Sequence, residues 1–295
     1  MEAFPSLIGQ PHVKEVLSRM VLHKTLPHAL LFVGPDHVGK TTLAGALCQE
    51  VLGTKRLDRH PDYLELKRLE DEKTGNRKSM ISVRQVRDLV GRLSLSSFSG
   101  GVKVAFIIEA HKLSMGAVNA LLKTLEEPKG QVLFLLRAPS REDLPATIVS
   151  RCQVMRLALV GQSEIAERLV RAGFSQTDAQ EAALHSEGRP GLALRFLKDS
   201  AYRAQRQTDR AQAEAFFAAR LPERLRLVVE LIPKSEANAA SRLQKVVTEL
   251  QAVARRQLFI NPSSISFLNR LSEVRQAARH NINPHLALEH VALSS

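Results

Sequence analysis

The first half of the chain alternates nearly continuous apolar runs with stretches of helical periodicity. Apolar runs of this kind are typical of strands that are buried on both faces of a parallel sheet. Between two of them, apolar residues recur at helical spacing over Ile81–Leu93, with Ser82 as the candidate N-cap. The alternation predicts an α/β domain with a parallel, doubly wound sheet. The candidate strands are Ala29–Val33, Tyr63–Leu66, Val102–Ile108 and Gln131–Leu136.

The second half contains only helical periodicity, and no strand-like apolar run follows Leu159. The pattern predicts an α/β domain over residues 1–160, a small three-helix unit over 161–200 and an all-helical region over 201–295. In the three-helix unit, Ser163 is the candidate N-cap of the first helix. The predicted helices are Ser163–Ala172, Ser175–Ser186, Leu192–Leu197, Ala201–Phe217, Pro222–Leu231, Ala237–Leu258 and Ser264–Arg279, with a last turn at Pro284–Ala292.

A glycine-rich loop links the first predicted strand to a helix. Residues 34–42 read G-P-D-H-V-G-K-T-T and directly follow the apolar run at 29–33. Glycines let such a loop wrap its N–H groups around a phosphate chain, and the next helix points its positive end at the same anion. In this motif the lysine reaches the β- and γ-phosphates and the next hydroxyl ligates Mg²⁺. We expect nucleotide binding by Gly34, Gly39, Lys40, Thr41 and Thr42.

Composition narrows the choice of partners and of compartment. The net charge of +12 favours a polyanion or an acidic partner, although a basic surface also serves solubility. With no tryptophan and two tyrosines, contacts to DNA should involve the backbone rather than the bases. Cys48 and Cys152 are too few for a disulfide framework or a cysteine-rich zinc site, so we expect no zinc. No run suits a membrane span or a signal peptide, and we expect a cytoplasmic protein.

Six ordered segments resemble the AAA+ clamp-loader ATPases. They are L-I-G-Q at 7–10, the loop at 34–42, H-P-D at 60–62, S-F-S-G-G-V-K-V at 97–104, N-A-L-L-K-T-L-E-E-P at 119–128 and S-R-C-Q at 150–153. The resemblance implies that the three-helix unit is a lid. It also implies that residues 201–295 form a collar that holds several subunits in a hetero-oligomeric ring. An isolated helical bundle is the alternative for the last region.

The same resemblance assigns a role to Arg151. In this family the arginine of the S-R-C segment reaches the ATP on a neighbouring subunit. A guanidinium suits that role because it is always charged and its fork meets phosphate oxygens as charge develops. Such arginine fingers are worth ~10³–10⁵ in rate in related NTPases. The alternative for Arg151 is an ordinary surface ion pair.

The motifs that make a subunit a motor are eroded. Motor members carry Asp-Glu after the third strand, and here those positions hold Ile108 and Glu109, so that Glu109 is a doubtful remnant. Isoleucine cannot ligate a hard cation that requires oxygen. The strand ending at Leu136 leads into Arg137 and Ala138, where the family has a neutral polar sensor. The lid arginine is replaced by Gly191. We therefore expect ATP and Mg²⁺ to bind weakly or without hydrolysis, and little or no intrinsic ATPase.

The resemblance also implies contacts to DNA. Arg84 and Arg87 share one face of the Ile81–Leu93 helix, and the corresponding helix of clamp loaders approaches the primer-template backbone. Lys123 is a weaker candidate, and a solvated helix face is the alternative.

The combined prediction is a non-motor subunit of the bacterial replicative clamp loader. Its partners would be a gamma/tau motor subunit, a delta subunit, the sliding clamp and primer-template DNA. The two alternatives are a catalytic motor of the gamma/tau type and a structural adaptor that binds no nucleotide.

Overall fold

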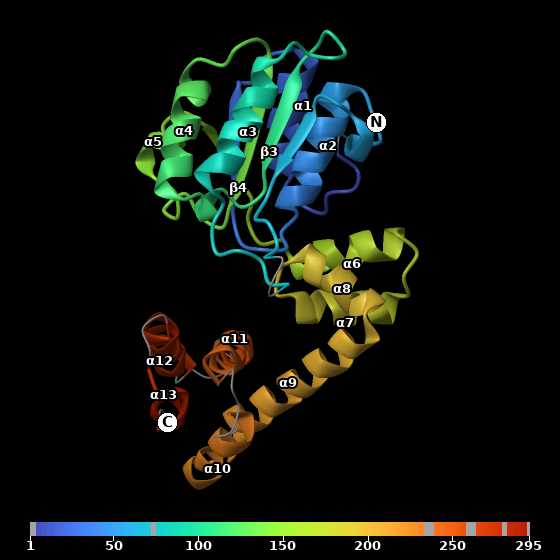
Figure 1. The fold of residues 1–295 in the computed structure, drawn as a ribbon. Coiled ribbons are helices and arrows are strands. Elements are labelled where there is room, and N and C mark those ends of the chain that lie inside the picture. Colours follow the sequence, from blue (N-terminus) through green and yellow to red (C-terminus); the bar gives the residue numbers. More distant parts are fainter. Residues whose placement is uncertain (1–3, 72–74, 233–238, 258–263, 279–281, 294–295) are drawn as a thin grey trace. The chain divides into compact units, whose positions relative to one another are not determined.

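The computed structural model describes residues 4–71, 75–232, 239–257, 264–278 and 282–293. The chain divides into two compact units, Met1–Leu194 and Arg195–Ser295 (Figure 1). The finer division into three domains at residues 160 and 200 stays a prediction. None of the helices in the described ranges is both long enough and apolar enough to cross a lipid bilayer.

A five-stranded parallel sheet forms the centre of the first unit. Its strand order is β2-β3-β4-β1-β5, and every pairing is parallel. This confirms the predicted α/β class, and four of the strands lie where the apolar runs predicted them. The edge strand β5 was not predicted, because three of its four residues are exposed and it therefore forms no apolar run. The strands are β1 (Ala29–Val33), β2 (Tyr63–Leu66), β3 (Lys103–Ile107), β4 (Val132–Ala138) and β5 (Gln153–Arg156).

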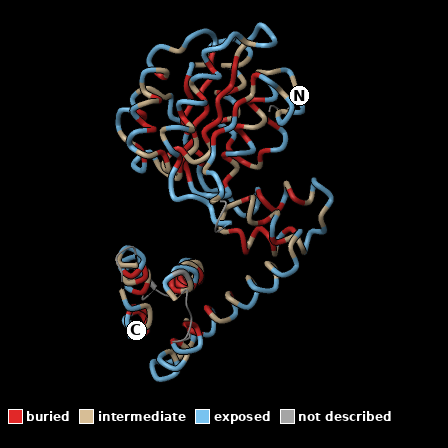
Figure 2. Tube along the Cα trace, viewed as in Figure 1, coloured by how far each residue is buried: buried red, intermediate tan, exposed pale blue. Residues whose placement is uncertain are grey.

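Helices cover both faces of this sheet, and each face has its own apolar core. Leu30 and Phe32 of β1 pack with residues of the first two helices, whereas Leu31 and Val33 pack with residues of the next two. The alternation places the buried central strands β1, β3 and β4 between two helical layers, seen as the red centre of the unit in Figure 2. The helices are α1 (Pro11–Leu22), α2 (Lys40–Leu52), α3 (Val83–Ser94), α4 (Met115–Glu126) and α5 (Ala146–Val149), with short 3-10 turns at Leu57–Arg59 and Ala110–Lys112.

Three further helices complete the first unit and lead into the second. They are α6 (Gln162–Arg171), α7 (Gln176–Ser186) and α8 (Pro190–Lys198), close to the predicted ranges. Ser175 caps α7 by accepting a hydrogen bond from the Asp178 N–H at 3.1 Å. The cap predicted at Ser163 is wrong, because α6 begins one residue earlier and its N-cap, Gly161, has no side chain.

The second unit is all-helical, as predicted. Its apolar core draws residues from every helix, including Phe216, Leu250, Leu271 and Leu288. The predicted ends at Ala237, Leu258 and Arg279 lie outside the described residues. The helices are α9 (Ser200–Ala218), α10 (Leu221–Leu231), α11 (Ala239–Gln257), α12 (Ser264–Ala277) and α13 (Pro284–Ala292).

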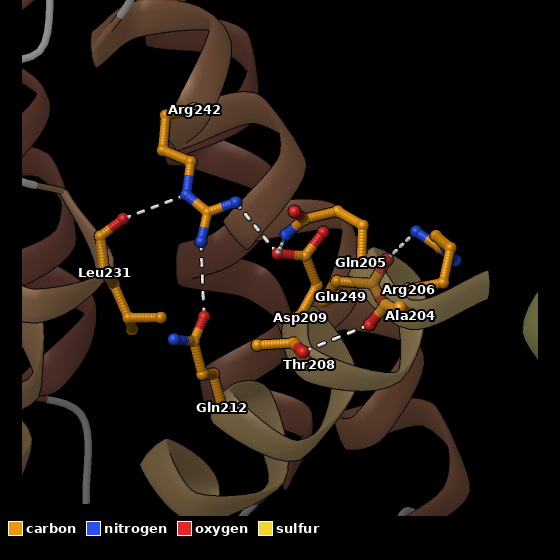
Figure 3. A network of polar contacts seen from close by, with 9 residues as sticks. All are labelled: Ala204, Gln205, Arg206, Thr208, Asp209, Gln212, Leu231, Arg242 and Glu249. Atoms are coloured by element: carbon orange, nitrogen blue, oxygen red, sulfur yellow. Dashed lines mark hydrogen bonds and ion pairs between the residues drawn. The ribbon is translucent and has the colours of Figure 1, made fainter. Parts of the chain in front are cut away.

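A polar network joins α9 to α11 (Figure 3). Arg242 donates to Asp209 Oδ1 at 2.8 Å, to Gln212 Oε1 at 3.2 Å and to the Leu231 carbonyl oxygen at 3.1 Å. Arg206 pairs with Glu249, whose side chain is 3% exposed. These contacts bind the two helices through charged groups that are largely withdrawn from water.

Candidate nucleotide site

The glycine-rich loop leaves the carboxyl end of β1 and turns sharply into α2. Gly34 has a φ of 145°, and a Cβ atom there would overlap the Leu157 carbonyl oxygen. Gly39 has a φ of 106°, and a Cβ atom there would overlap the Leu7 side chain. Both conformations and both close approaches require glycine. The two glycines therefore act as the motif requires, by letting the loop close tightly at the start of α2.

A cavity of about 350 Å³ lies over this loop, within the first unit. It brings together the predicted residues Gly39, Lys40, Thr41 and Thr42. Its other walls come from segments outside the loop. The N-terminal segment supplies Leu7 and Ile8, β4 supplies Arg137, and the start of α8 supplies Gly191.

Lys40 is buried beneath the loop. Its Nζ donates to the carbonyl oxygens of Gly34 and of Pro35, the latter at 2.7 Å, and lies 3.5 Å from Asp36 Oδ1. Burial lowers the pKa of Lys40, and the nearby Asp36 carboxylate opposes that shift. The ammonium is thus held by the loop that would present it to a phosphate.

Arg137 connects three elements at the edge of the cavity. Its Nη1 donates to the Thr41 hydroxyl at 2.6 Å, and its Nε donates to the Ile108 carbonyl oxygen at 2.7 Å. A guanidinium therefore lies next to Ala138, the predicted sensor position, and it reaches the hydroxyl that ligates Mg²⁺ in P-loop proteins. The sequence carries no signal for this contact, because it depends on the register that pairs Arg137 of β4 with Phe32 of β1.

Glu109 is engaged away from the cavity. Arg68 donates to its two carboxylate oxygens at 2.9 and 2.8 Å, and the Glu109 side chain is 13% exposed. These hydrogen bonds hold the pKa of Glu109 below its ordinary value, against the opposite effect of burial. The residue does not line the cavity.

The start of α8 closes over the loop at Gly191. Its N–H donates to the His37 carbonyl oxygen at 2.9 Å, and a Cβ atom would lie 3.1 Å from that oxygen. A larger side chain here would have to displace the loop. Arg189 lies two residues before Gly191, with its Nη2 atom 4.0 Å from Glu187 Oε2, and it does not line the cavity.

Arg151 lies at the end of α5, also outside the cavity. It pairs with Glu126 at the end of α4 through Nε at 2.8 Å, and its Nη1 donates to the Thr147 carbonyl oxygen at 2.9 Å. Its side chain is 33% exposed. The guanidinium is therefore fixed at the surface rather than directed into this chain's own site.

The candidate DNA-binding residues are exposed. Arg84 and Arg87 lie on α3, and Lys123 lies on α4, which packs against α3. Their role in DNA binding stays a prediction.

Comparisons with known proteins identify the family of the chain. The family model described as DNA polymerase III, delta subunit, matches residues 9–161, which is just over half of the chain. The DNA polymerase III subunit delta' of Haemophilus influenzae is 34% identical over 224 residues, 70% of this chain and 64% of that protein. The DNA polymerase III subunit tau of Bacillus subtilis is 31% identical over 200 residues, 62% of this chain and 34% of that protein.

The alignments thus span less than two thirds of each relative's own length. Among solved structures, the RuvB Holliday junction branch migration motor of Thermotoga maritima superposes with a TM-score of 0.53 at 18% identity, over 78% of this chain and 84% of that chain. That likeness shows the fold alone. On the family model and the relatives, the chain belongs to the delta-prime subunit family of DNA polymerase III, within the AAA+ clamp-loader proteins.

Proposed function

We propose that this chain is a non-motor subunit of the bacterial replicative clamp loader. It stands beside a motor subunit, donates Arg151 to that neighbour's ATP, and hydrolyses little or no nucleotide itself. The observation that carries the proposal is a contrast within the first unit. The P-loop keeps its glycines and its lysine, whereas Ile108, Ala138 and Gly191 stand where a motor needs a carboxylate, a neutral polar sensor and an arginine.

Two contacts support the proposal that this chain hydrolyses little or no ATP. Hydrolysis by this family's mechanism needs a carboxylate to orient the attacking water and a metal ion to neutralise the developing charge. The nearest remnant, Glu109, forms a bidentate pair with Arg68. The metal-side hydroxyl of Thr41 accepts a hydrogen bond from Arg137. Neither group is placed for its motor role.

The position of Arg151 supports action in trans. The residue lies outside the cavity of its own chain and a third of its side chain is exposed, so a neighbouring subunit's phosphate can approach it. Its contacts to Glu126 and Thr147 restrict the guanidinium, which lowers the entropy lost when it engages a phosphate. An ion pair with Glu126 is also what a purely structural arginine would make, so the role requires a functional test.

Membership of the ring follows as part of the proposal. The partners are a gamma/tau motor subunit, a delta subunit and the sliding clamp, and the second unit serves as the collar. Arg84, Arg87 and Lys123 contact the primer-template backbone. Each phosphate contact that is lost should then reduce, by about one unit, the slope of the logarithm of the DNA-binding constant against the logarithm of the salt concentration.

The decisive experiment combines the purified chain with its motor and delta subunits and measures single-turnover ATP hydrolysis with clamp and primed DNA present. Arg151→Ala should slow hydrolysis at the neighbouring site by ~10³–10⁵, the worth of an arginine finger. Arg141→Ala is the matched control, because Arg141 makes a highly exposed pair with Glu142. Size-exclusion chromatography checks that each variant still assembles.

The outcomes separate this proposal from its alternatives. Equal hydrolysis with Arg151→Ala would remove the finger role. Turnover that survives Arg151→Ala but disappears with Lys40→Ala would instead favour a catalytic motor. Absence of nucleotide binding at millimolar concentration would favour a structural adaptor.

A further inference from the structure

The position that holds Mg²⁺ in P-loop proteins is already engaged by a cation of this chain. In the motif, the hydroxyl that follows the lysine ligates the metal. Here that hydroxyl belongs to Thr41, and the Arg137 guanidinium donates to it at 2.6 Å. A divalent cation bound to the same oxygen would lie next to a permanent positive charge.

The oxygen ligands that would compensate such a charge are also missing or engaged. Mg²⁺ requires near-octahedral oxygen coordination and usually takes one or two carboxylates. Position 108 is isoleucine, and its carbonyl oxygen accepts a hydrogen bond from Arg137 Nε at 2.7 Å. The next residue, Glu109, is held by Nε and Nη2 of Arg68, one on each carboxylate oxygen. The residues present therefore do not fit the metal ion that the fold family implies.

A polyphosphate, by contrast, does fit. Gly34 and Gly39 give the loop its tight curvature, and the N-terminus of the 13-residue helix α2 faces the loop. Lys40 lies beneath it, and the cavity above it measures about 350 Å³. Arg137 has five N–H donors, of which the two contacts described use two. Its fork suits phosphate oxygens in two-point contact.

We infer that this loop is a metal-independent site for nucleoside di- and triphosphates, in which the Arg137 guanidinium supplies the positive charge that Mg²⁺ supplies in a P-loop ATPase. The inference deepens the proposed function and rests on its claim that the chain holds nucleotide without turning it over. It gives that claim a physical cause, since a fixed cation stabilises the ground state of bound phosphate without activating water.

The test is isothermal titration of the purified full-length chain with ADP and, separately, with inorganic pyrophosphate. Each titration is run with Mg²⁺ and with EDTA at matched ionic strength. The wild-type dissociation constant should differ by less than about threefold between the two conditions. Arg137→Asn should weaken binding in EDTA by roughly tenfold to a hundredfold, the usual effect of losing a charge-assisted hydrogen bond.

Two further variants guard the interpretation. Arg137→Lys keeps the charge but not the fork, so it should weaken binding in EDTA clearly less than Arg137→Asn does. If Arg137 only held β4 to its neighbours, both substitutions would weaken binding to the same extent. Arg141→Asn, at an exposed arginine outside the cavity, should bind like wild type in both conditions. Circular dichroism melting confirms that each variant is folded.

Each contrary result overturns the inference in a recognisable way. Wild-type binding that needs Mg²⁺ would overturn it while leaving nucleotide binding intact. Unchanged binding by Arg137→Asn in EDTA would also overturn it. If neither probe binds in either condition, both the inference and the nucleotide part of the proposed function are wrong, whereas the Arg151 experiment stands independently.

Discussion

At the scale of single residues, pattern and chemistry predicted the loop but not its neighbours. Gly34, Gly39 and Lys40 are recognisable because their roles depend on local sequence alone. The contact between Arg137 and Thr41 joins residues 96 positions apart, and it depends on the sheet register that places the end of β4 beside β1. A single sequence indicates that the neutral sensor is missing, but not what the neighbouring Arg137 side chain touches.

Asp62 is a second residue whose role appears only in the fold. Its carboxylate accepts hydrogen bonds from the N–H groups of Phe98 and Ser99, both at 2.9 Å, and from the hydroxyls of Ser97 and Ser99. It is 1% exposed. This explains why the H-P-D and S-F-S-G-G segments occur together, since the first anchors the second.

The acid sensitivity of the first unit should depend on Asp62. Burial alone would raise its pKa, but the hydrogen bonds from Ser99, Phe98 and Ser97 outweigh burial and hold the pKa well below its ordinary value. The pKa of an aspartate in the unfolded chain is about 3.9. Because the pKa of Asp62 is lower in the folded protein, its carboxylate stabilises the fold at pH values above about 3.9, and this stabilisation is lost as the pH falls below that value.

Asp62→Asn should therefore lower the free energy of unfolding by about 2 kcal/mol at pH 7, because hydrogen bonds to a charged group are replaced by weaker ones. The difference between variant and wild type should shrink between about pH 4 and pH 2. Urea titrations at several pH values measure it. Asp58→Asn, at an exposed aspartate, is the control, and an equal pH dependence in all three proteins would contradict the assignment.

At the scale of elements, apolar periodicity located the buried strands and most helices, because burial and periodicity have the same cause. It missed β5, because this edge strand pairs with β1 on one side only and most of its residues are exposed. It also misplaced the start of α6, where Gly161 rather than Ser163 is the N-cap. Caps depend on one backbone conformation, which apolar spacing does not encode.

The cap at Ser82 was predicted correctly and can be tested on its own. The Gln85 N–H donates to the Ser82 hydroxyl at 3.3 Å, and Gln85 Oε1 accepts from the Ser82 N–H at 3.1 Å, forming a capping box at the start of α3. Ser82→Ala should reduce the free energy of unfolding by about 1 kcal/mol. Chemical denaturation measures it, with the exposed Ser96→Ala as control. A difference below the control's own change would show that the cap contributes nothing.

At the scale of the whole molecule, alternating strands and helices followed by helices alone were sufficient to predict an α/β unit and an all-helical unit. The sequence did not indicate which contacts hold the two longest helices of the second unit, α9 and α11, against each other. Arg206 and Arg210 lie in a basic stretch that has the pattern of a solvated helix face, yet their side chains are 15% and 8% exposed and pair with Glu249 and Glu214. Solvated and interior arginines look alike in a sequence, because only the partner distinguishes them.

Arg242 offers the clearest test of that network. Its three hydrogen bonds reach α9 and the end of α10, and its partner Asp209 is 10% exposed (Figure 3). Removing one member of a largely buried pair leaves the other charge poorly compensated and typically costs about 3–5 kcal/mol. Because Asp209 also accepts from Gln205 at 2.9 Å, we expect Arg242→Ala to cost nearer 3 kcal/mol.

The loss should be confined to the second unit. Thermal and urea unfolding of the full chain should show that unit melting earlier, while ADP binding at the P-loop of the first unit is unchanged. Arg226→Ala, at an exposed arginine of α10, should shift stability by no more than about 0.5 kcal/mol. If Arg242→Met is as stable as wild type, the apolar part of the side chain rather than its charge holds α9 to α11. If Arg242→Ala is no worse than the control, the network contributes nothing to the stability of the helical unit.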